Sequence, residues 1–135
     1  EATELSKPAT AAARLNAKAN RSHNIELARL SAEEMTSAMA GERPYRRLAD
    51  LKQPLRDYQF NTLLVDPPRA GLDAATLELS SVFKRVLYIS CNPETLSDNL
   101  ATLSSTHSIE SLAFFDQFPY THHLESGVVL RRKTA

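Results

Sequence analysis

Cysteine, glycine and tryptophan are scarce in this chain of 135 residues, which has one cysteine, three glycines and no tryptophan. The single cysteine, Cys91, excludes an internal disulfide framework and a zinc site built from several cysteines. No apolar run approaches the roughly 20 residues of a membrane-spanning helix, and no secretory signal opens the sequence. We therefore expect a cytoplasmic protein with no membrane partner.

Net charge is also lacking, because 16 basic residues balance 16 acidic ones. Bulk charge therefore gives no support for nucleic-acid binding, and any contact with RNA must come from local basic groups. Clusters of basic residues are more often part of a solvated surface than an RNA-binding site. The candidates are Arg43, Arg46 and Arg47; Arg131, Arg132 and Lys133; and the single Arg69.

Helices and strands alternate along the first half of the chain. Ser6 can cap a helix that has Pro8 in its first turn and runs to about Asn20. Ser-Ala-Glu-Glu at 31–34 has the spacing of a capping box and predicts a second helix ending near Gly41. The other predicted segments are a strand end at 1–5, a strand at 24–30, and an irregular stretch with one helical turn at most at 42–58.

The second half shows the alternation more clearly. Two short apolar runs, at 62–65 and 86–89, are typical of buried parallel strands. Asp73 and Asn92 can each cap a helix, and Pro93 suits the first helical position because its missing N–H would be unpaired there. The other predictions are helix ends near residues 82 and 105, strands at 109–115 and 127–130, and a loop at 117–125.

This alternation predicts an α/β fold with a largely parallel sheet in one domain. Only the connection between the last two strands lacks a helix. Its nine-residue loop suits a hairpin better than a right-handed crossover. The last strand should therefore be antiparallel.

Reactive side chains should meet at one edge of this sheet. Ligands bind beyond the carboxyl ends of the strands in open parallel sheets, and Asp66 and Cys91 each follow such an end. Glu125 lies at the start of the antiparallel strand, which is on the same edge. Glu4 ends the first strand and should join them.

These residues lie in distinctive motifs. In Asp-Pro-Pro-Arg at 66–69, the prolines stiffen a loop that can hold an acidic and a basic side chain over a flat ligand. In Ser-Cys-Asn-Pro at 90–93, the cysteine precedes a helix start, where unpaired N–H groups favour the nucleophilic thiolate. In Phe-Pro-Tyr-Thr-His-His-Leu-Glu at 118–125, the adjacent histidines point differently and lack an evident third ligand, so no metal is expected. Taken singly, the motifs also fit a plain turn, a buried thiol and a surface charge.

Together, the segments DPPRAGLD, YISCNPETL and FDQFPYTHHLE resemble the tRNA (uracil-5-)-methyltransferase family, most densely from Phe60 to Leu130. Asp-Pro-Pro resembles the fourth motif of S-adenosylmethionine methyltransferases, and Arg69 in place of Tyr or Phe points away from amine methylation. The resemblance implies the C-terminal part of a class I, Rossmann-like methyltransferase sheet that lacks its first strand.

The resemblance also implies methylation of carbon 5 of a T-loop uridine in tRNA. The Cys91 thiolate would add to carbon 6, carbon 5 would take a methyl group from S-adenosyl-L-methionine, and Glu125 would remove the carbon-5 proton before Cys91 leaves. The base must leave its stack, so base flipping is expected. The other implied roles are contacts of Glu4, through the ribose hydroxyls, and Asp66 with S-adenosyl-L-methionine, and of Arg69 with RNA.

Two parts of the family pattern should precede this sequence, namely the glycine-containing cofactor loop with its strand and the RNA-binding region. The glycines at 41, 71 and 127 form no Gly-x-Gly loop. The missing strand belongs between the strands that end at Glu4 and Asp66, so two sheet edges are left unpaired. We expect a second copy of the chain or a local rearrangement to close this gap.

These 135 residues expressed alone should therefore have no methyltransferase activity, because the cofactor loop is not among them. Transfer of a labelled methyl group to tRNA measures this directly. Detectable transfer by the isolated chain would refute the prediction.

Three alternatives stay open. A ribosomal-RNA uracil-5-methyltransferase has the same chemistry, and the choice of RNA methylated by the full-length protein separates the two. An RNA cytosine-5-methyltransferase usually has a cysteine after the proline of the fourth motif, where this chain has Pro68 and Arg69. A non-catalytic RNA-binding domain would keep its function after substitution of Cys91.

Overall fold

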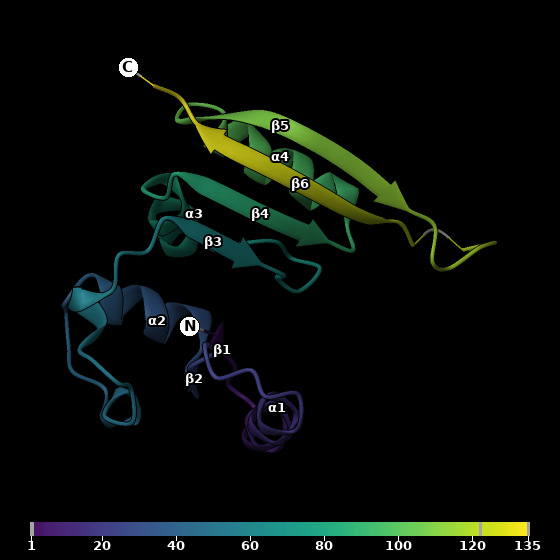
Figure 1. The fold of residues 1–135 in the computed structure, drawn as a ribbon. Helices are drawn as coiled ribbons and strands as arrows, with labels where there is room; N and C mark the ends of the chain where they lie inside the picture. Colours follow the sequence, from purple (N-terminus) through teal and green to yellow (C-terminus); the bar gives the residue numbers. More distant parts are fainter. Residues whose placement is uncertain (1, 122, 135) are drawn as a thin grey trace. The chain divides into compact units, whose positions relative to one another are not determined.

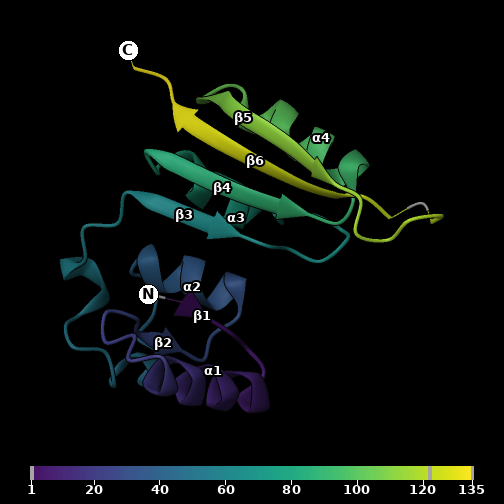
Figure 2. The ribbon, with the colours of Figure 1, turned by 45° about the vertical axis from the view of Figure 1, so that its right-hand side comes forward.

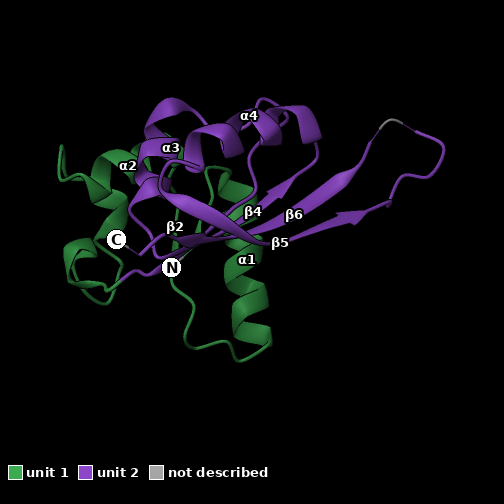
Figure 3. Ribbon diagram, turned by 90° about the horizontal axis from the view of Figure 1, so that it is seen from above, with its two compact units in different colours: residues 1–59 green, residues 60–135 purple. Residues whose placement is uncertain are grey.

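The computed structural model describes residues 2–121 and 123–134, which form two compact units, Glu1–Gln59 and Phe60–Ala135 (Figure 3). Each unit has a sheet of its own. The expectation of a single domain stays a prediction. None of the helices in the described ranges is long and apolar enough to cross a membrane.

The first unit has a two-stranded parallel sheet of β1, Ala2–Thr3, and β2, Leu27–Ala28. The helix α1, Lys7–Ala19, connects them and begins at the predicted cap, where Ser6 Oγ accepts a hydrogen bond from Ala9 N at 3.3 Å. The helix α2, Ala32–Met39, has both hydrogen bonds of the predicted capping box. The strand predicted at 24–30 is thus much shorter than expected.

The stretch at 42–58 contains two short 3₁₀ turns, η1 at Arg46–Leu48 and η2 at Leu55–Asp57, where the sequence predicted one turn at most. Close to these turns, Glu26 accepts hydrogen bonds from the Lys52 backbone and the Tyr58 hydroxyl. These contacts hold the irregular segment against Glu26, a distant residue of the same unit.

The second unit confirms the expected α/β fold. Its sheet has the strand order β3-β4-β6-β5, and β6 pairs antiparallel with both neighbours while β3 and β4 are parallel (Figures 1 and 2). The strands β3, β4 and β5 thus run in one direction, and β6 runs against them. The predicted hairpin joins β5 to β6. The elements are β3 Thr62–Val65, α3 Ala74–Ser81, β4 Arg85–Ser90, α4 Pro93–Leu103, β5 His107–Phe115 and β6 Glu125–Arg132.

Both helices of this unit lie on the same face of its sheet (Figure 3). Side chains buried beneath them include Val86, Tyr88, Leu96, Leu103, Val128 and Leu130. No helix of this unit covers the other face, where Leu64 is 61% and Ile89 is 39% exposed. The prediction that 62–65 and 86–89 are fully buried strands is therefore wrong, because the unit buries only one face of its sheet.

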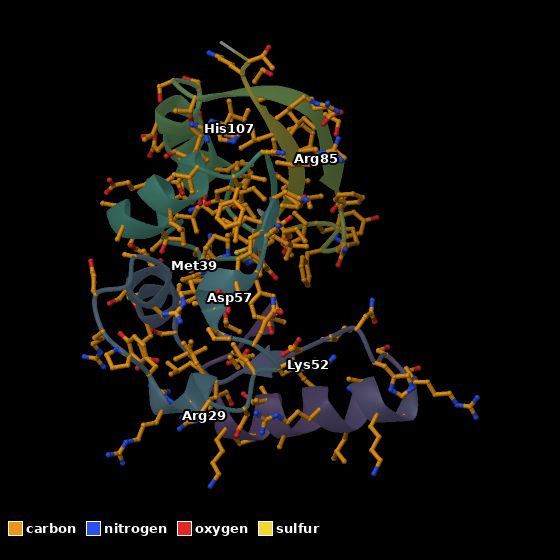
Figure 4. The ribbon with its side chains drawn as sticks, turned by 60° about the vertical axis from the view of Figure 1, so that its left-hand side comes forward. Arg29, Met39, Lys52, Asp57, Arg85 and His107 are labelled. Carbon is orange, nitrogen blue, oxygen red and sulfur yellow. The ribbon has the colours of Figure 1, made fainter. Side chains whose placement is uncertain are left out.

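The last parallel strand begins two residues earlier than predicted, at His107. The imidazole is buried, with Nε2 3.0 Å from the Phe83 carbonyl oxygen and Nδ1 2.9 Å from Thr106 Oγ1. His107 lies on the helix-covered side of the sheet and Arg85 on the open side (Figure 4). Hydrogen bonds to the imidazole therefore fix where β5 starts.

One edge of β1 and one edge of β3 are unpaired among the described strands. In these residues β1 pairs only with β2, and β3 only with β4. No local rearrangement of the described strands closes either edge. Pairing with a second copy stays a prediction.

Asp73 caps α3 and should make the stability of the second unit depend on pH. Its carboxylate accepts hydrogen bonds from the Thr76 hydroxyl at 2.6 Å and the Thr76 amide at 2.9 Å, and these bonds hold its pKa below the ordinary value of 3.8. Asp73→Ala should lower the free energy of unfolding by about 0.5–2 kcal/mol at neutral pH. This contribution is fully present above the ordinary pKa and disappears as the pH falls through the lower folded-state pKa.

Urea unfolding of the parent and Asp73→Ala from about pH 6 to about pH 2 measures the effect. The two free energies should converge in acid, whereas Asp73→Asn should keep an uncharged cap at every pH. A parent–Ala difference that does not change with pH would contradict this role.

Candidate active site

The pairing of β4 with β6 determines which residues meet at the edge of the four-stranded sheet. The strands pair antiparallel with Ser90 opposite Ser126. Continuing this register by one residue sets Cys91 opposite Glu125. Directly opposite residues on neighbouring strands have Cβ atoms about 4.5–5.5 Å apart. The two residues are 34 positions apart in the sequence, and strand pairing brings them together.

Asp66 lies at the same edge on the adjacent strand. The strands β3 and β4 pair in parallel, and Val65 lies beside Tyr88. Extending this register by one residue sets Asp66 beside Ile89. Its side chain is exposed. The structure thus places Asp66, Cys91 and Glu125 at one edge of the sheet, on three neighbouring strands.

Cys91 lies in a tight turn between β4 and α4. The buried hydroxyl of Ser90 accepts a hydrogen bond from Asn92 N at 3.1 Å and donates one to Asn92 O at 3.0 Å. Asn92 then caps α4, since its Oδ1 accepts a hydrogen bond from Glu94 N at 3.2 Å. Cys91 as a whole residue is partly exposed at this helix start.

Arg69 is exposed, but its backbone is firmly held. The Arg69 carbonyl oxygen accepts hydrogen bonds from Asn92 Nδ2 at 3.1 Å and Thr95 Oγ1 at 3.0 Å. Asn92, which immediately follows the cysteine, therefore caps its helix and also holds the loop that follows Asp66. This double role fixes the loop and the cysteine turn to the same helix end.

The sequence predicted the cap at Asn92 but missed Thr95 and Asn99, which also bind this loop. One signal could have revealed them. Positions 92, 95 and 99 are separated by three and four residues, so they share one face of a helix. Polar residues at that spacing, on a helix that begins directly after Cys91, indicate a contact with another segment.

Glu4 lies in the first unit, directly after β1. Its Oε1 accepts a hydrogen bond from Ser6 N at 2.7 Å, and the side chain is exposed. Its position beside Asp66, Cys91 and Glu125 stays a prediction.

His122 lies outside the described residues, and the residues that are described contain no group of three or more His, Cys, Asp or Glu arranged to hold a metal ion.

A family model described as tRNA (Uracil-5-)-methyltransferase matches residues 1–133. The chain belongs to this family. The chain is 58% identical over 132 residues to a tRNA/tmRNA (uracil-C(5))-methyltransferase of Neisseria meningitidis serogroup B, covering 98% of this chain and 36% of that protein. A relative with the same name from Acinetobacter baylyi is 57% identical over 129 residues, which are 96% of this chain and 36% of the relative. The chain thus spans about a third of the length of these curated relatives.

A solved structure of a family member has the same fold. It is the Pyrococcus abyssi tRNA (uracil-54, C5)-methyltransferase in complex with S-adenosyl-L-homocysteine, with a TM-score of 0.66 and 27% sequence identity. The match covers 95% of this chain and 27% of that one. This likeness confirms the Rossmann-like methyltransferase fold expected from the sequence.

Proposed function

We propose that these residues belong to an S-adenosyl-L-methionine-dependent tRNA uracil-5-methyltransferase in which Cys91 is the nucleophile and Glu125 the general base. The observation that carries this proposal is the β4–β6 register, which, continued by one residue beyond Ser90 and Ser126, pairs the partly exposed Cys91 with Glu125. The names of the relatives favour tRNA over ribosomal RNA and uracil over cytosine as the substrate.

The two residues perform complementary steps on one pyrimidine. The Cys91 thiolate adds to carbon 6 of uracil, and the resulting enolate makes carbon 5 electron-rich enough to accept a methyl group. Glu125 then takes the proton from carbon 5, and the electron pair of that C–H bond forms the carbon 5–carbon 6 double bond as Cys91 leaves. A flipped base that lies over the two neighbouring strand ends gives both side chains access.

Two exposed carboxylates fit the polar groups of S-adenosyl-L-methionine, which when bound supplies an electrophilic methyl group. Asp66 and Glu4 each directly follow the carboxyl end of a strand in their own unit, and open parallel sheets bind ligands beyond such ends. Carboxylates accept hydrogen bonds from hydroxyl and amino groups. Glu4 would hold the ribose hydroxyls and Asp66 another polar group of the same molecule.

Arg69 would contact the RNA. Its guanidinium can bind a phosphate or a base edge through two parallel hydrogen bonds. The two bonds to its carbonyl oxygen hold the backbone while leaving the exposed side chain available. Pairing with a second copy through the exposed edges of β1 and β3 also remains part of the proposal.

Substitutions of Cys91 and Glu125 in the full-length protein should separate the two roles. Cys91→Ser should abolish methyl transfer and form no adduct. Glu125→Gln should slow turnover by about 10²–10⁴-fold, because adduct forms but the carbon-5 proton is not removed. Denaturing electrophoresis and mass spectrometry with unmodified tRNA should therefore show a covalent protein–RNA adduct with Glu125→Gln only.

Glu78→Gln, which removes an exposed carboxylate from α3, is the matched control and should behave like the parent. Turnover by Cys91→Ser at the parent rate would exclude the nucleophile assignment. RNA binding by the parent without methyl transfer would instead favour a non-catalytic RNA-binding role. The same assay with ribosomal RNA tests the substrate class, and preferential methylation of ribosomal RNA would contradict the proposal.

A further inference from the structure

Polar side chains along one face of α4 hold the loop that follows β3. Asn92 and Thr95 both donate hydrogen bonds to the Arg69 carbonyl oxygen. One turn further along the helix, Asn99 Oδ1 accepts a hydrogen bond from Leu72 N at 2.8 Å. The loop from Arg69 to Leu72 therefore follows the helix that begins beside Cys91.

Asn99 is the buried end of this set of contacts. Its exposed fraction is 9%, and the same Oδ1 accepts a second hydrogen bond, from the Tyr88 hydroxyl at 2.7 Å. Tyr88 lies on β4, three residues before Cys91, and is only 1% exposed. Burial raises the pKa of Tyr88, so its hydroxyl stays protonated and continues to donate at neutral pH. One oxygen atom thus joins the loop, the helix and the strand that leads to the cysteine.

The loop approaches Asn99 so closely that only glycine fits at position 71. Gly71 has φ +80°, a conformation that side chains rarely adopt. A Cβ atom there would lie 2.7 Å from Asn99 Oδ1. Substitution of Gly71 on the loop, or of Asn99 on the helix, should therefore disturb the same hydrogen bond between Leu72 N and Asn99 Oδ1.

We propose that Asn99 is a positioning residue for methyl transfer, whose amide oxygen sets the loop of Asp66 and Arg69 in place relative to Cys91. Asn99 reaches no substrate itself and acts through Leu72 and the loop backbone. The inference rests on the proposed function, because it assumes that Cys91 and the loop act on the same RNA. A purely structural asparagine would stabilise the fold without affecting the rate of attack by Cys91.

The test uses full-length protein and tRNA containing 5-fluorouridine, because fluorine at carbon 5 blocks the final proton loss and leaves the Cys91 adduct in place. The measurements are the rate of adduct formation at saturating RNA, the Kd for RNA, and Tm. Asn99→Leu, which removes the acceptor, should slow adduct formation by about ten- to a hundredfold. Asn99→Asp, which keeps an acceptor oxygen, should restore the parent rate.

Leu103→Ala is the matched control, because it removes buried side-chain volume from the same helix without touching the loop. It should lower Tm as Asn99→Leu does while leaving the rate of adduct formation within about twofold of the parent. Gly71→Ala should slow adduct formation as Asn99→Leu does, and the double variant should be no slower than the slower single variant.

Equal rates for Asn99→Leu and Leu103→Ala would overturn the inference. Where Asn99→Leu does not fold, Gly71→Ala decides, and adduct formation by that variant at the parent rate overturns it equally. Absence of an adduct with the parent protein would instead contradict the proposed function, so the two failures are distinguishable.

Discussion

The antiparallel pairing of β4 with β6 is the interaction on which the rest of the second unit depends. Six residue pairs connect the strands, from Arg85 opposite Arg131 to Ser90 opposite Ser126. Alternate residues on both strands are buried against α3 and α4, so a slip of one residue would turn every buried side chain to the open face. Burial therefore selects one register. The buried residues are Val86, Tyr88 and Ser90 on β4 and Ser126, Val128 and Leu130 on β6.

The same register has a chemical consequence at the end of the strands. It brings a thiol and a carboxylate from distant parts of the sequence to opposite positions, where no local motif could place them. The hydroxyl of Ser90, itself buried by the pairing, then shapes the turn at Cys91. Packing of the sheet and presentation of the thiol thus depend on the same residues.

The helix α4 extends this organisation to the neighbouring loop. Its first residues follow the cysteine, and its polar face binds the backbone that follows Asp66. A rigid helix can hold two such segments in fixed relation, whereas a free loop of prolines and a glycine could take several positions. The arrangement suits chemistry in which a nucleophile and a substrate-binding loop must face one base.

The sequence predicted the features that depend on local chemistry. The caps at Ser6, Ser31, Asp73 and Asn92 form as expected, because a cap needs only a side chain and the amides two or three residues later. The carboxyl ends of β3 and β4 were also well placed, and parallel pairing then required Asp66 to share an edge with Cys91.

Features that depend on distant contacts could not be predicted in this way. The burial of β3 depends on what covers each face of the sheet, and the apolar run at 62–65 carries no information on that cover. The bond between Asn99 and Leu72 joins residues 27 positions apart, so no local pattern includes both. The length of β2 likewise depends on its pairing with a distant segment, in which Ala2 lies beside Leu27 and Thr3 beside Ala28.

Disulfide formation between positions 91 and 125 in this 135-residue chain tests the register most directly, because Cys91 is the only cysteine among these residues. Glu125→Cys sets a second thiol opposite it, at a Cβ separation of about 4.5–5.5 Å, close to the span of a disulfide. Mild oxidation should link the two within one chain, as shown by peptide mass mapping without reduction, whereas Ser126→Cys, on the helix-covered face, should stay free. A link to position 126, or none to 125, would contradict the account.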